Sequence, residues 1–128
     1  MTKKRAVVYV IDDDESVRRA FERLLRSVDF DVETFSSAEE FLDNPMQTRN
    51  ACILMDIRMP GLTGFELQKR LVSQGIEIPV IVISASDDVQ VREQARELGA
   101  VVFFRKPVDD QALLDSIWWA ISGRRKNG

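Results

Sequence analysis

Short apolar runs alternate with segments of helical periodicity five times along this 128-residue chain. The first run, Ala6–Ile11, is apolar throughout, as a strand that is covered on both faces should be. Strands that alternate with helices in this way are typical of a parallel sheet with helices on both faces, so we predict an α/β domain. The predicted strands are Ala6–Ile11, Asp31–Phe35, Ala51–Met55, Ile78–Ile83 and Val101–Phe104.

Apolar residues recur at helical spacing after each predicted strand. Ser36 and Glu39 have the spacing of a capping box before a short second helix, which we expect Pro45 to end. Gly75 and Gly99 are expected to end the third and fourth helices. The apolar positions are Val17, Ala20, Phe21, Leu24, Leu25 and Val28 in the first helix, Phe41 and Leu42 in the second, Phe65, Leu67 and Leu71 in the third, Val91, Ala95 and Leu98 in the fourth, and Leu113, Leu114, Ile117, Trp118 and Ile121 in the fifth.

The composition argues against several classes of function. A net charge of −3 gives no reason to expect direct contact with nucleic acid. No apolar run reaches the roughly 18 residues of a membrane span, and the charged N-terminus is not a signal peptide, so we expect a cytoplasmic protein. Cys52, the single cysteine, lies in an apolar run and is expected to be a small buried hydrophobic residue. Because the chain has no histidine, any phosphohistidine must come from a partner.

The length fits one domain, to which we assign residues 1–123. Residues 124–128 are interpreted as a basic C-terminal tail or the start of a linker.

Polar residues follow four of the five predicted strands at the point where each strand ends. Asp12 and Asp13 follow the first strand, Asp56 the third, Ser84 the fourth, and Lys106 the fifth with one residue between. In an open α/β sheet, ligands bind in the crevice outside the carboxyl ends of the strands. We therefore predict that three carboxylates, a hydroxyl and an ammonium converge there. Such a set suits one divalent cation and one phosphoryl group.

The crowded carboxylates predict a metal ion. Three carboxylates this close repel one another, and one would take up a proton unless a cation joined them. Mg²⁺ fits, because it takes hard oxygen ligands and keeps waters beside one or two carboxylates. A calcium loop of the EF-hand type is disfavoured, since its alternating acids, central glycine and terminal glutamate are missing. The neighbouring Asp14 and Glu15 are interpreted as a solvated helix start.

Asp56 is the candidate phosphoacceptor. It lies between Met55 and Ile57, where an acid without a function is unfavourable, although it could simply cap a strand end. A carboxylate can act as a nucleophile and form an aspartyl phosphate, and this transfer needs positioning and charge neutralisation more than further covalent chemistry. Mg²⁺ would neutralise some phosphoryl oxygens and Lys106 another, while Ser84 offers a hydroxyl donor. Taken singly, Ser84 is compatible with a turn serine and Lys106 with a surface lysine.

These motifs together resemble the receiver domain of two-component response regulators, and the resemblance covers nearly the whole chain. They are VIDDDESVRR around Asp12 and Asp13, LMDIRMPGLTG around Asp56, VISAS around Ser84, and FFRKP around Lys106. The combination is highly specific, whereas no single motif is. The DDDE acids and the DIRMP segment are most similar to the FixJ-like receivers.

The resemblance implies a (βα)5 flavodoxin-like fold, a doubly wound parallel sheet with strand order 2-1-3-4-5. It implies that a sensor histidine kinase donates a phosphoryl group to Asp56. It also implies that Mg²⁺ is held by Asp13, Asp56 and the backbone carbonyl of Arg58, with Asp12 acting largely through water. A cis peptide bond between Lys106 and the following proline is implied as well.

The resemblance further implies a conformational switch. Ser84 would turn towards the phosphoryl group and Phe103 would rotate inward, although Phe103 is equally compatible with core packing. These residues replace the commoner threonine and tyrosine, but a hydroxyl and a movable ring are both retained. The switched surface would comprise the fourth helix, the fifth strand and the fifth helix. On that last helix, Trp119 lies opposite the apolar stripe and is expected to be exposed, either as a partner surface or as a lone surface residue.

We therefore predict a phosphoacceptor receiver that catalyses only its own phosphorylation and dephosphorylation. It would act alone or as the front of a transcriptional regulator, with a fused or separate output domain and with dimerisation on phosphorylation as a further possibility. An aspartyl-phosphate phosphatase of the haloacid-dehalogenase class is disfavoured, because that class needs an aspartate at position 58, which is Arg58 here. A pseudo-receiver that serves only as an interaction module is disfavoured by the complete set of site residues.

Overall fold

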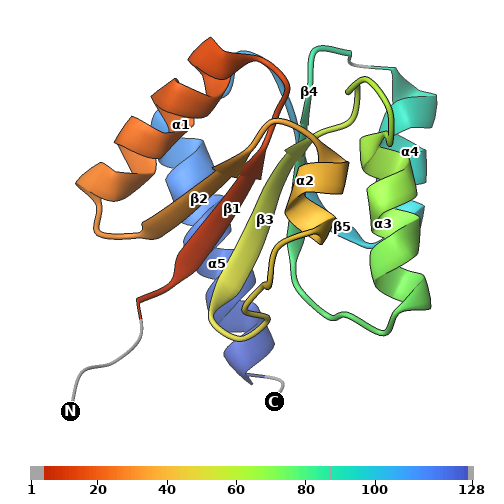
Figure 1. The fold of residues 1–128 in the computed structure, drawn as a ribbon. Helices are drawn as coiled ribbons and strands as arrows, with labels where there is room; N and C mark the ends of the chain where they lie inside the picture. Colours follow the sequence, from red (N-terminus) through yellow and green to blue (C-terminus); the bar gives the residue numbers. More distant parts are fainter. Residues whose placement is uncertain (1–4, 87, 127–128) are drawn as a thin grey trace.

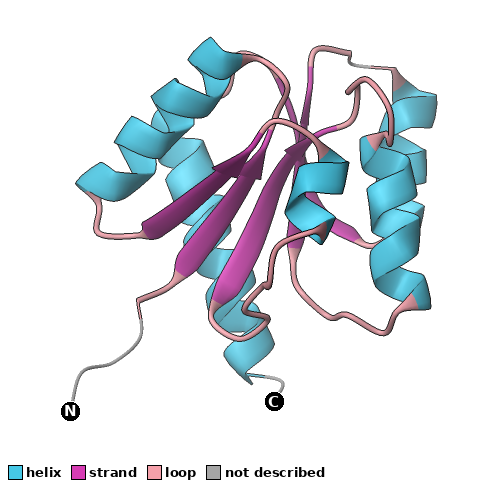
Figure 2. Ribbon diagram, viewed as in Figure 1, coloured by secondary structure: helices cyan, strands magenta, loops and turns pink. Residues whose placement is uncertain are grey.

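A five-stranded parallel sheet lies between two layers of helices (Figure 1). The computed structural model describes residues 5–86 and 88–126. The strand order is β2-β1-β3-β4-β5, and every neighbouring pair of strands is parallel, as predicted. The alternation of strands and helices along the chain is shown by secondary structure in Figure 2. None of the helices in the described residues is long and apolar enough to cross a membrane.

Each strand is followed by one helix in chain order. The strands are β1 (Val7–Ile11), β2 (Asp31–Phe35), β3 (Ala51–Asp56), β4 (Val80–Ser84) and β5 (Ala100–Arg105). The helices are α1 (Glu15–Ser27), α2 (Ala38–Leu42), α3 (Gly64–Ser73), α4 (Val89–Glu97) and α5 (Asp110–Lys126). Because α5 extends to Lys126, positions 124–126 of the expected tail are helical, whereas positions 127–128 lie outside the described residues.

The core has one cluster of apolar side chains on each face of the sheet. Successive residues of a strand point to opposite faces, so Tyr9 and Ile11 pack in one cluster and Val8 and Val10 in the other. The first cluster lies under α2, α3 and α4, and the second under α1 and α5. Figure 1 shows these two groups of helices on opposite faces of the sheet. Cys52 is fully buried in the second cluster, as expected.

Strand β4 begins two residues later than predicted, at Val80 instead of Ile78. The cause is Pro79, which has no N–H to donate to the ladder. Pro79 still contributes its carbonyl, which accepts a hydrogen bond from the Ile53 N–H at 2.9 Å. At its other end β4 includes Ser84, which pairs with Arg105 of β5.

The start of α2 differs from the prediction by one residue. Ser37, not Ser36, is the N-cap, and its side chain accepts a hydrogen bond from the Glu40 N–H at 3.0 Å. Glu39 instead accepts a hydrogen bond from the Leu62 N–H, across to the loop after β3, at 3.1 Å. The helix ends at Leu42, before Pro45 is reached. Consecutive serines and consecutive glutamates produce the same capping-box spacing twice, so spacing alone cannot choose between them.

Candidate functional site

Three carboxylates meet at the carboxyl edge of the sheet, where the sequence places them. Asp12 and Asp13 follow β1, and Asp56 is the last residue of β3. One carboxylate oxygen of each lies within 4.8 Å of the others. Asp12 and Asp56 are only 3% and 8% exposed, whereas Asp13 is open to solvent. Two buried acids therefore stand behind one accessible acid.

Lys106 bridges the two buried acids. Its Nζ lies 3.0 Å from Asp12 Oδ2 and 3.1 Å from Asp56 Oδ2. The backbone N–H of Lys106 donates to the Ser84 carbonyl at 2.8 Å, which continues the ladder between β4 and β5 beyond the end of β5. The peptide bond between Lys106 and Pro107 is cis, as implied by the resemblance. The ammonium is thus positioned by the sheet itself.

The electrostatics of the site favour a further cation. Burial raises the pKa of the Asp12 carboxyl above its usual value, although hydrogen bonds from the Asp14 N–H and from Lys106 oppose the shift. Burial alone would lower the pKa of Lys106, but its hydrogen bonds to Asp12 and Asp56 outweigh that effect, so the pKa lies above its ordinary value. Three carboxylates against one ammonium leave two negative charges, which matches a divalent ion with oxygen ligands.

The loop between β1 and α1 is fixed by hydrogen bonds at Asp12 and Asp14. Asp12 Oδ1 accepts a hydrogen bond from the Asp14 N–H at 2.9 Å, and Asp14 in turn caps α1 by accepting from the N–H groups of Ser16 and Val17. The Arg18 guanidinium donates to the Asp12 carbonyl at 2.7 Å. Sequence reasoning missed Arg18, because an arginine on an amphipathic helix gives no sign that it turns back to the preceding loop.

The loop between β3 and α3 is held close to Asp56. The Arg58 N–H donates to Asp56 Oδ1 at 3.2 Å, and the Gly64 N–H donates to the Ile57 carbonyl at 2.9 Å. A Cβ at Gly64 would lie 2.7 Å from the Asp56 carbonyl oxygen and 2.9 Å from the Ile57 Cα, so only glycine permits this approach. Helix α3 therefore starts directly against the end of β3.

Ser84 lies at the end of β4, and Phe103 lies on the neighbouring strand β5. Ser84 is fully buried, and its Oγ accepts a hydrogen bond from the Ser86 N–H at 3.1 Å. Phe103 is half-buried on β5, and the Arg92 guanidinium carbon of α4 lies 5.9 Å from the centre of its ring. Arg92 thereby connects α4 to the aromatic side chain that the sequence singles out.

The family model of the response regulator receiver domain matches residues 8–118. The chain belongs to this family. It is 38% identical over 125 residues to the transcriptional regulatory protein TdiR of Thauera aromatica, an alignment that covers 98% of this chain and 55% of TdiR. It is 41% identical over 110 residues to FixJ of Azorhizobium caulinodans, with coverage of 86% and 52% respectively.

Solved receiver structures agree with this assignment. The crystal structure of the N-terminal domain of FixJ superposes with a TM-score of 0.85 and 35% identity, and covers 94% of this chain and 96% of that chain. The chain is therefore a receiver domain of the kind found in two-component signal transduction, with FixJ among its relatives, and not a haloacid-dehalogenase phosphatase. It spans about half the length of the curated relatives that it matches.

Proposed function

We propose that Asp56 is the phosphoacceptor of this receiver domain. The observation that carries the proposal is the position of its carboxylate, which lies at the end of β3, bonds to Lys106, and lies close to Asp12 and Asp13. A buried acid of this kind has few solvent contacts to lose when it reacts, and it shares the Lys106 ammonium with Asp12.

A phosphohistidine of a sensor histidine kinase is the proposed donor, since this chain has no histidine of its own. An oxygen of Asp56 attacks the phosphorus, a P–O bond forms, and the P–N bond of the donor breaks. The electron pair of the broken bond returns to the imidazole nitrogen of the kinase. Lys106 is positioned to pair with an oxygen of the transferred group, because its ammonium already contacts the accepting carboxylate.

Asp13, Asp56 and the Arg58 carbonyl are the proposed ligands of Mg²⁺, with Asp12 acting through water. The exposed carboxylate of Asp13 and the residual charge of the cluster support this assignment. Bound Mg²⁺ would supply positive charge to the phosphoryl oxygens. The hydrogen bonds of Asp14 and Arg18 keep the Asp12 backbone and carboxylate in place for this role.

The proposed output is a change in the surface made by α4, β5 and α5. Ser84 would exchange its hydrogen bond with Ser86 for one with the phosphoryl group, and Phe103 would move inward. The position of Arg92 over the Phe103 ring supports a link between this movement and α4. The surface would contact a second copy of the chain or an output domain, through Trp119 among other residues.

The partners and location of the full protein are inferred from its relatives. TdiR and FixJ are transcriptional regulators by name, and this chain aligns with 55% and 52% of their lengths. We infer that residues 1–123 act as the receiver of such a regulator, in the cytoplasm where its DNA lies, while this domain itself makes no direct contact with nucleic acid. In this role its chemistry is limited to its own phosphorylation and dephosphorylation.

Incubation with acetyl phosphate and Mg²⁺ tests the assignment. The intact mass of the wild type should increase by one phosphoryl group, and that of Asp56→Asn should not. Asp43→Asn, which removes an exposed carboxylate at the end of α2, is the matched control and should be labelled like the wild type. Equal labelling of Asp56→Asn and wild type would show that the acceptor lies elsewhere.

A further inference from the structure

A buried glutamine on α3 is hydrogen bonded to the backbone of α4. Gln68 is 1% exposed, and its Nε2 donates to the Ala95 carbonyl at 3.0 Å. The bond joins two helices that are 27 residues apart at these positions. The position of Gln68 on α3 is buried, and an apolar side chain is the usual residue at such a position. A buried amide is normally hydrogen bonded, but no local sequence pattern indicates its partner.

The Ala95 carbonyl is one of the acceptors that a helix leaves without a partner at its C-terminal end. The N–H that would close the next helical turn belongs to Gly99, but it donates to the Arg96 carbonyl at 3.0 Å. Ala95 is also fully buried, so water cannot easily take the place of the missing donor. The side-chain amide of Gln68 therefore caps the end of α4 from the neighbouring helix.

The buried side-chain oxygen of Gln68, Oε1, has no hydrogen-bond donor among the described residues. A buried acceptor without a donor destabilises the fold, whereas a leucine of similar volume would not have this cost. The residue is thus a poor choice for stability alone, and its contribution is the placement of α4.

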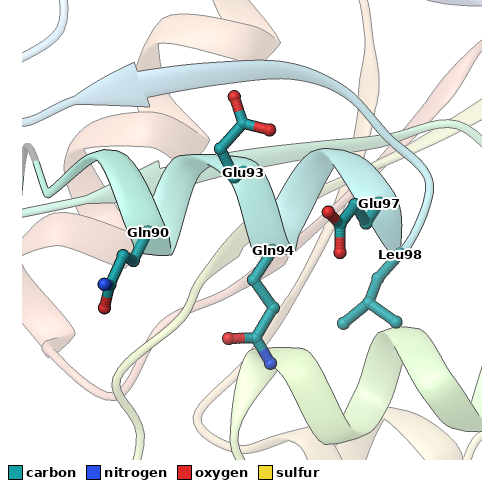
Figure 3. A pocket seen from close by; sticks show the side chains of 5 residues that line it. All are labelled: Gln90, Glu93, Gln94, Glu97 and Leu98. Atoms are coloured by element: carbon teal, nitrogen blue, oxygen red, sulfur yellow. The ribbon is translucent and has the colours of Figure 1, made fainter.

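Helix α4 depends on this placement because little else buries it. Ala95 is its one buried residue, and the structure describes the whole of the helix. An open hollow beside this helix is lined by Gln90, Glu93, Gln94, Glu97 and Leu98 (Figure 3). In that view Gln94 and Leu98 extend towards α3, the helix that carries Gln68.

We propose that Gln68 is a positioning residue of the switch, which holds α4 against α3 in the unphosphorylated arrangement and releases it when Asp56 is phosphorylated. The proposal rests on the function proposed above and deepens it. A phosphoryl group can shift α4 only if some contact differs between the two arrangements. We assign this difference to the Gln68–Ala95 hydrogen bond, which joins α3 to α4 in the present structure. A movement of α4 that broke the bond would let the Ala95 carbonyl reach water.

Amide hydrogen exchange of residues 89–99 tests the proposal in Gln68→Leu. Gln74→Leu, which removes an exposed glutamine just after the same helix, is the matched control. In the unphosphorylated state, Gln68→Leu should exchange these amides roughly two- to tenfold faster than wild type and control, the shift that one net hydrogen bond supplies. Exchange in β1, β3 and α3 should not change, which separates a loss of placement from a loss of global stability.

The same exchange measurement is then made on the phosphorylated proteins, and the intact mass confirms that the phosphoryl group has been added. Wild type and Gln74→Leu should then gain exchange in residues 89–99, while Gln68→Leu should gain less than about twofold because its bond is already absent. If no mass is gained, the proposed phosphoacceptor fails, but the comparison of unphosphorylated proteins still decides the role of Gln68. Exchange in unphosphorylated Gln68→Leu equal to that of the control would overturn the inference.

The side-chain N–H groups of Gln68 can be followed by NMR in the wild-type protein, so this measurement does not depend on whether a variant folds. The two N–H resonances, assigned by their absence in Gln68→Met, should shift on phosphorylation as the hydrogen bond to Ala95 breaks. Resonances that stay in place while the mass shows full phosphorylation would equally overturn the inference.

Discussion

The three carboxylates of the site differ in their contact with Lys106. The ammonium satisfies one oxygen each of Asp12 and Asp56, and Asp13 faces solvent without such a contact to Lys106. The accessible acid is therefore the one most available to an incoming cation. Because Lys106 pairs with Asp12 and Asp56, removal of Asp13 should lower the affinity for the cation more than removal of either of them.

Removal of Asp13 should weaken Mg²⁺ binding. We expect Asp13→Ala to lose at least about tenfold in affinity, since even residues that only orient a ligand cost about that much. Isothermal titration calorimetry at fixed ionic strength measures the affinity. Asp115→Ala, which removes an exposed acid on α5, is the control and should bind like the wild type. An unchanged affinity in Asp13→Ala would refute the proposed ligand set.

Stability at alkaline pH should depend on Lys106. Its pKa in the folded protein is raised above 10.5 by its hydrogen bonds to Asp12 and Asp56, which outweigh the effect of burial. The stabilisation is therefore complete below pH 10.5 and is lost as the pH rises through the folded pKa. Urea unfolding should show a steeper loss of unfolding free energy above that pH in the wild type than in Lys106→Met.

Two other groups act in the same direction and are common to both proteins. Burial raises the pKa of the Tyr9 hydroxyl and raises that of the Cys52 thiol to about 12. Both side chains stay protonated in the folded state after the unfolded chain has begun to ionise, so they too destabilise the fold as the pH rises. The difference between wild type and Lys106→Met isolates the lysine, and parallel curves for the two proteins would contradict its assigned charge state.

At the scale of elements, the helices begin where side chains supply hydrogen bonds to their free N–H groups. At α3 the Thr63 side chain accepts from the Glu66 N–H at 3.2 Å, and Glu66 accepts from the Thr63 N–H at 2.9 Å. This reciprocal capping box lies at the end of the loop that follows Asp56, so it orients the loop and the helix together.

Loss of this cap should destabilise the domain. We expect Thr63→Ala to lower the free energy of unfolding by about 1 kcal/mol, because one free N–H of α3 loses its partner. Urea denaturation monitored by circular dichroism measures the change. Ser73→Ala, which removes a hydroxyl at the other end of the same helix, should cost much less. Equal effects of the two substitutions would show that the cap adds nothing.

Helix α5 presents two tryptophans in different settings. Trp118 stacks against Phe30 with ring centres 4.6 Å apart and remains 48% exposed. Trp119 is 60% exposed, which confirms the expectation that it lies away from the apolar stripe. A large exposed aromatic ring is a residue type common at the centre of protein interfaces.

Substitution of Trp119 should affect association and not chemistry. We expect Trp119→Ala to weaken self-association of the phosphorylated protein, measured by analytical ultracentrifugation, while the mass gained with acetyl phosphate stays unchanged. Val72→Ala, a change at an exposed apolar residue on α3, is the matched control. If Trp119→Ala associates like the wild type after phosphorylation, Trp119 is a lone surface residue.

For the molecule as a whole, the sequence was sufficient to predict which site residues lie at the same edge of the sheet. Parallel strands place their carboxyl ends at one edge, so Asp12, Asp56 and Lys106 could be expected together once the strands were recognised. The strand order itself came from resemblance to a family, since the apolar pattern of a strand does not name its neighbours. It is confirmed by the hydrogen-bonded pairs of the sheet.

Contacts between distant segments could not be predicted in this way. Gln68 bonds to Ala95, and Glu39 bonds to Leu62 across 23 residues, because packing brings their helices and loops together. For neither residue does the spacing in the sequence indicate the hydrogen-bond partner. The metal and switch roles of Asp13, Arg58, Ser84 and Phe103 stay predictions, as does the boundary after residue 123.

Chemical trapping of the phosphorylated residue measures the proposed chemistry most directly. After treatment with acetyl phosphate and Mg²⁺, borohydride reduces an aspartyl phosphate to homoserine with release of phosphate, and tryptic peptides are then sequenced by mass spectrometry. We predict homoserine at position 56 alone, in the peptide that spans residues 50–58. Homoserine at Asp12 or Asp13, or at no position in a protein that has gained a phosphoryl group, would contradict the assignment of Asp56.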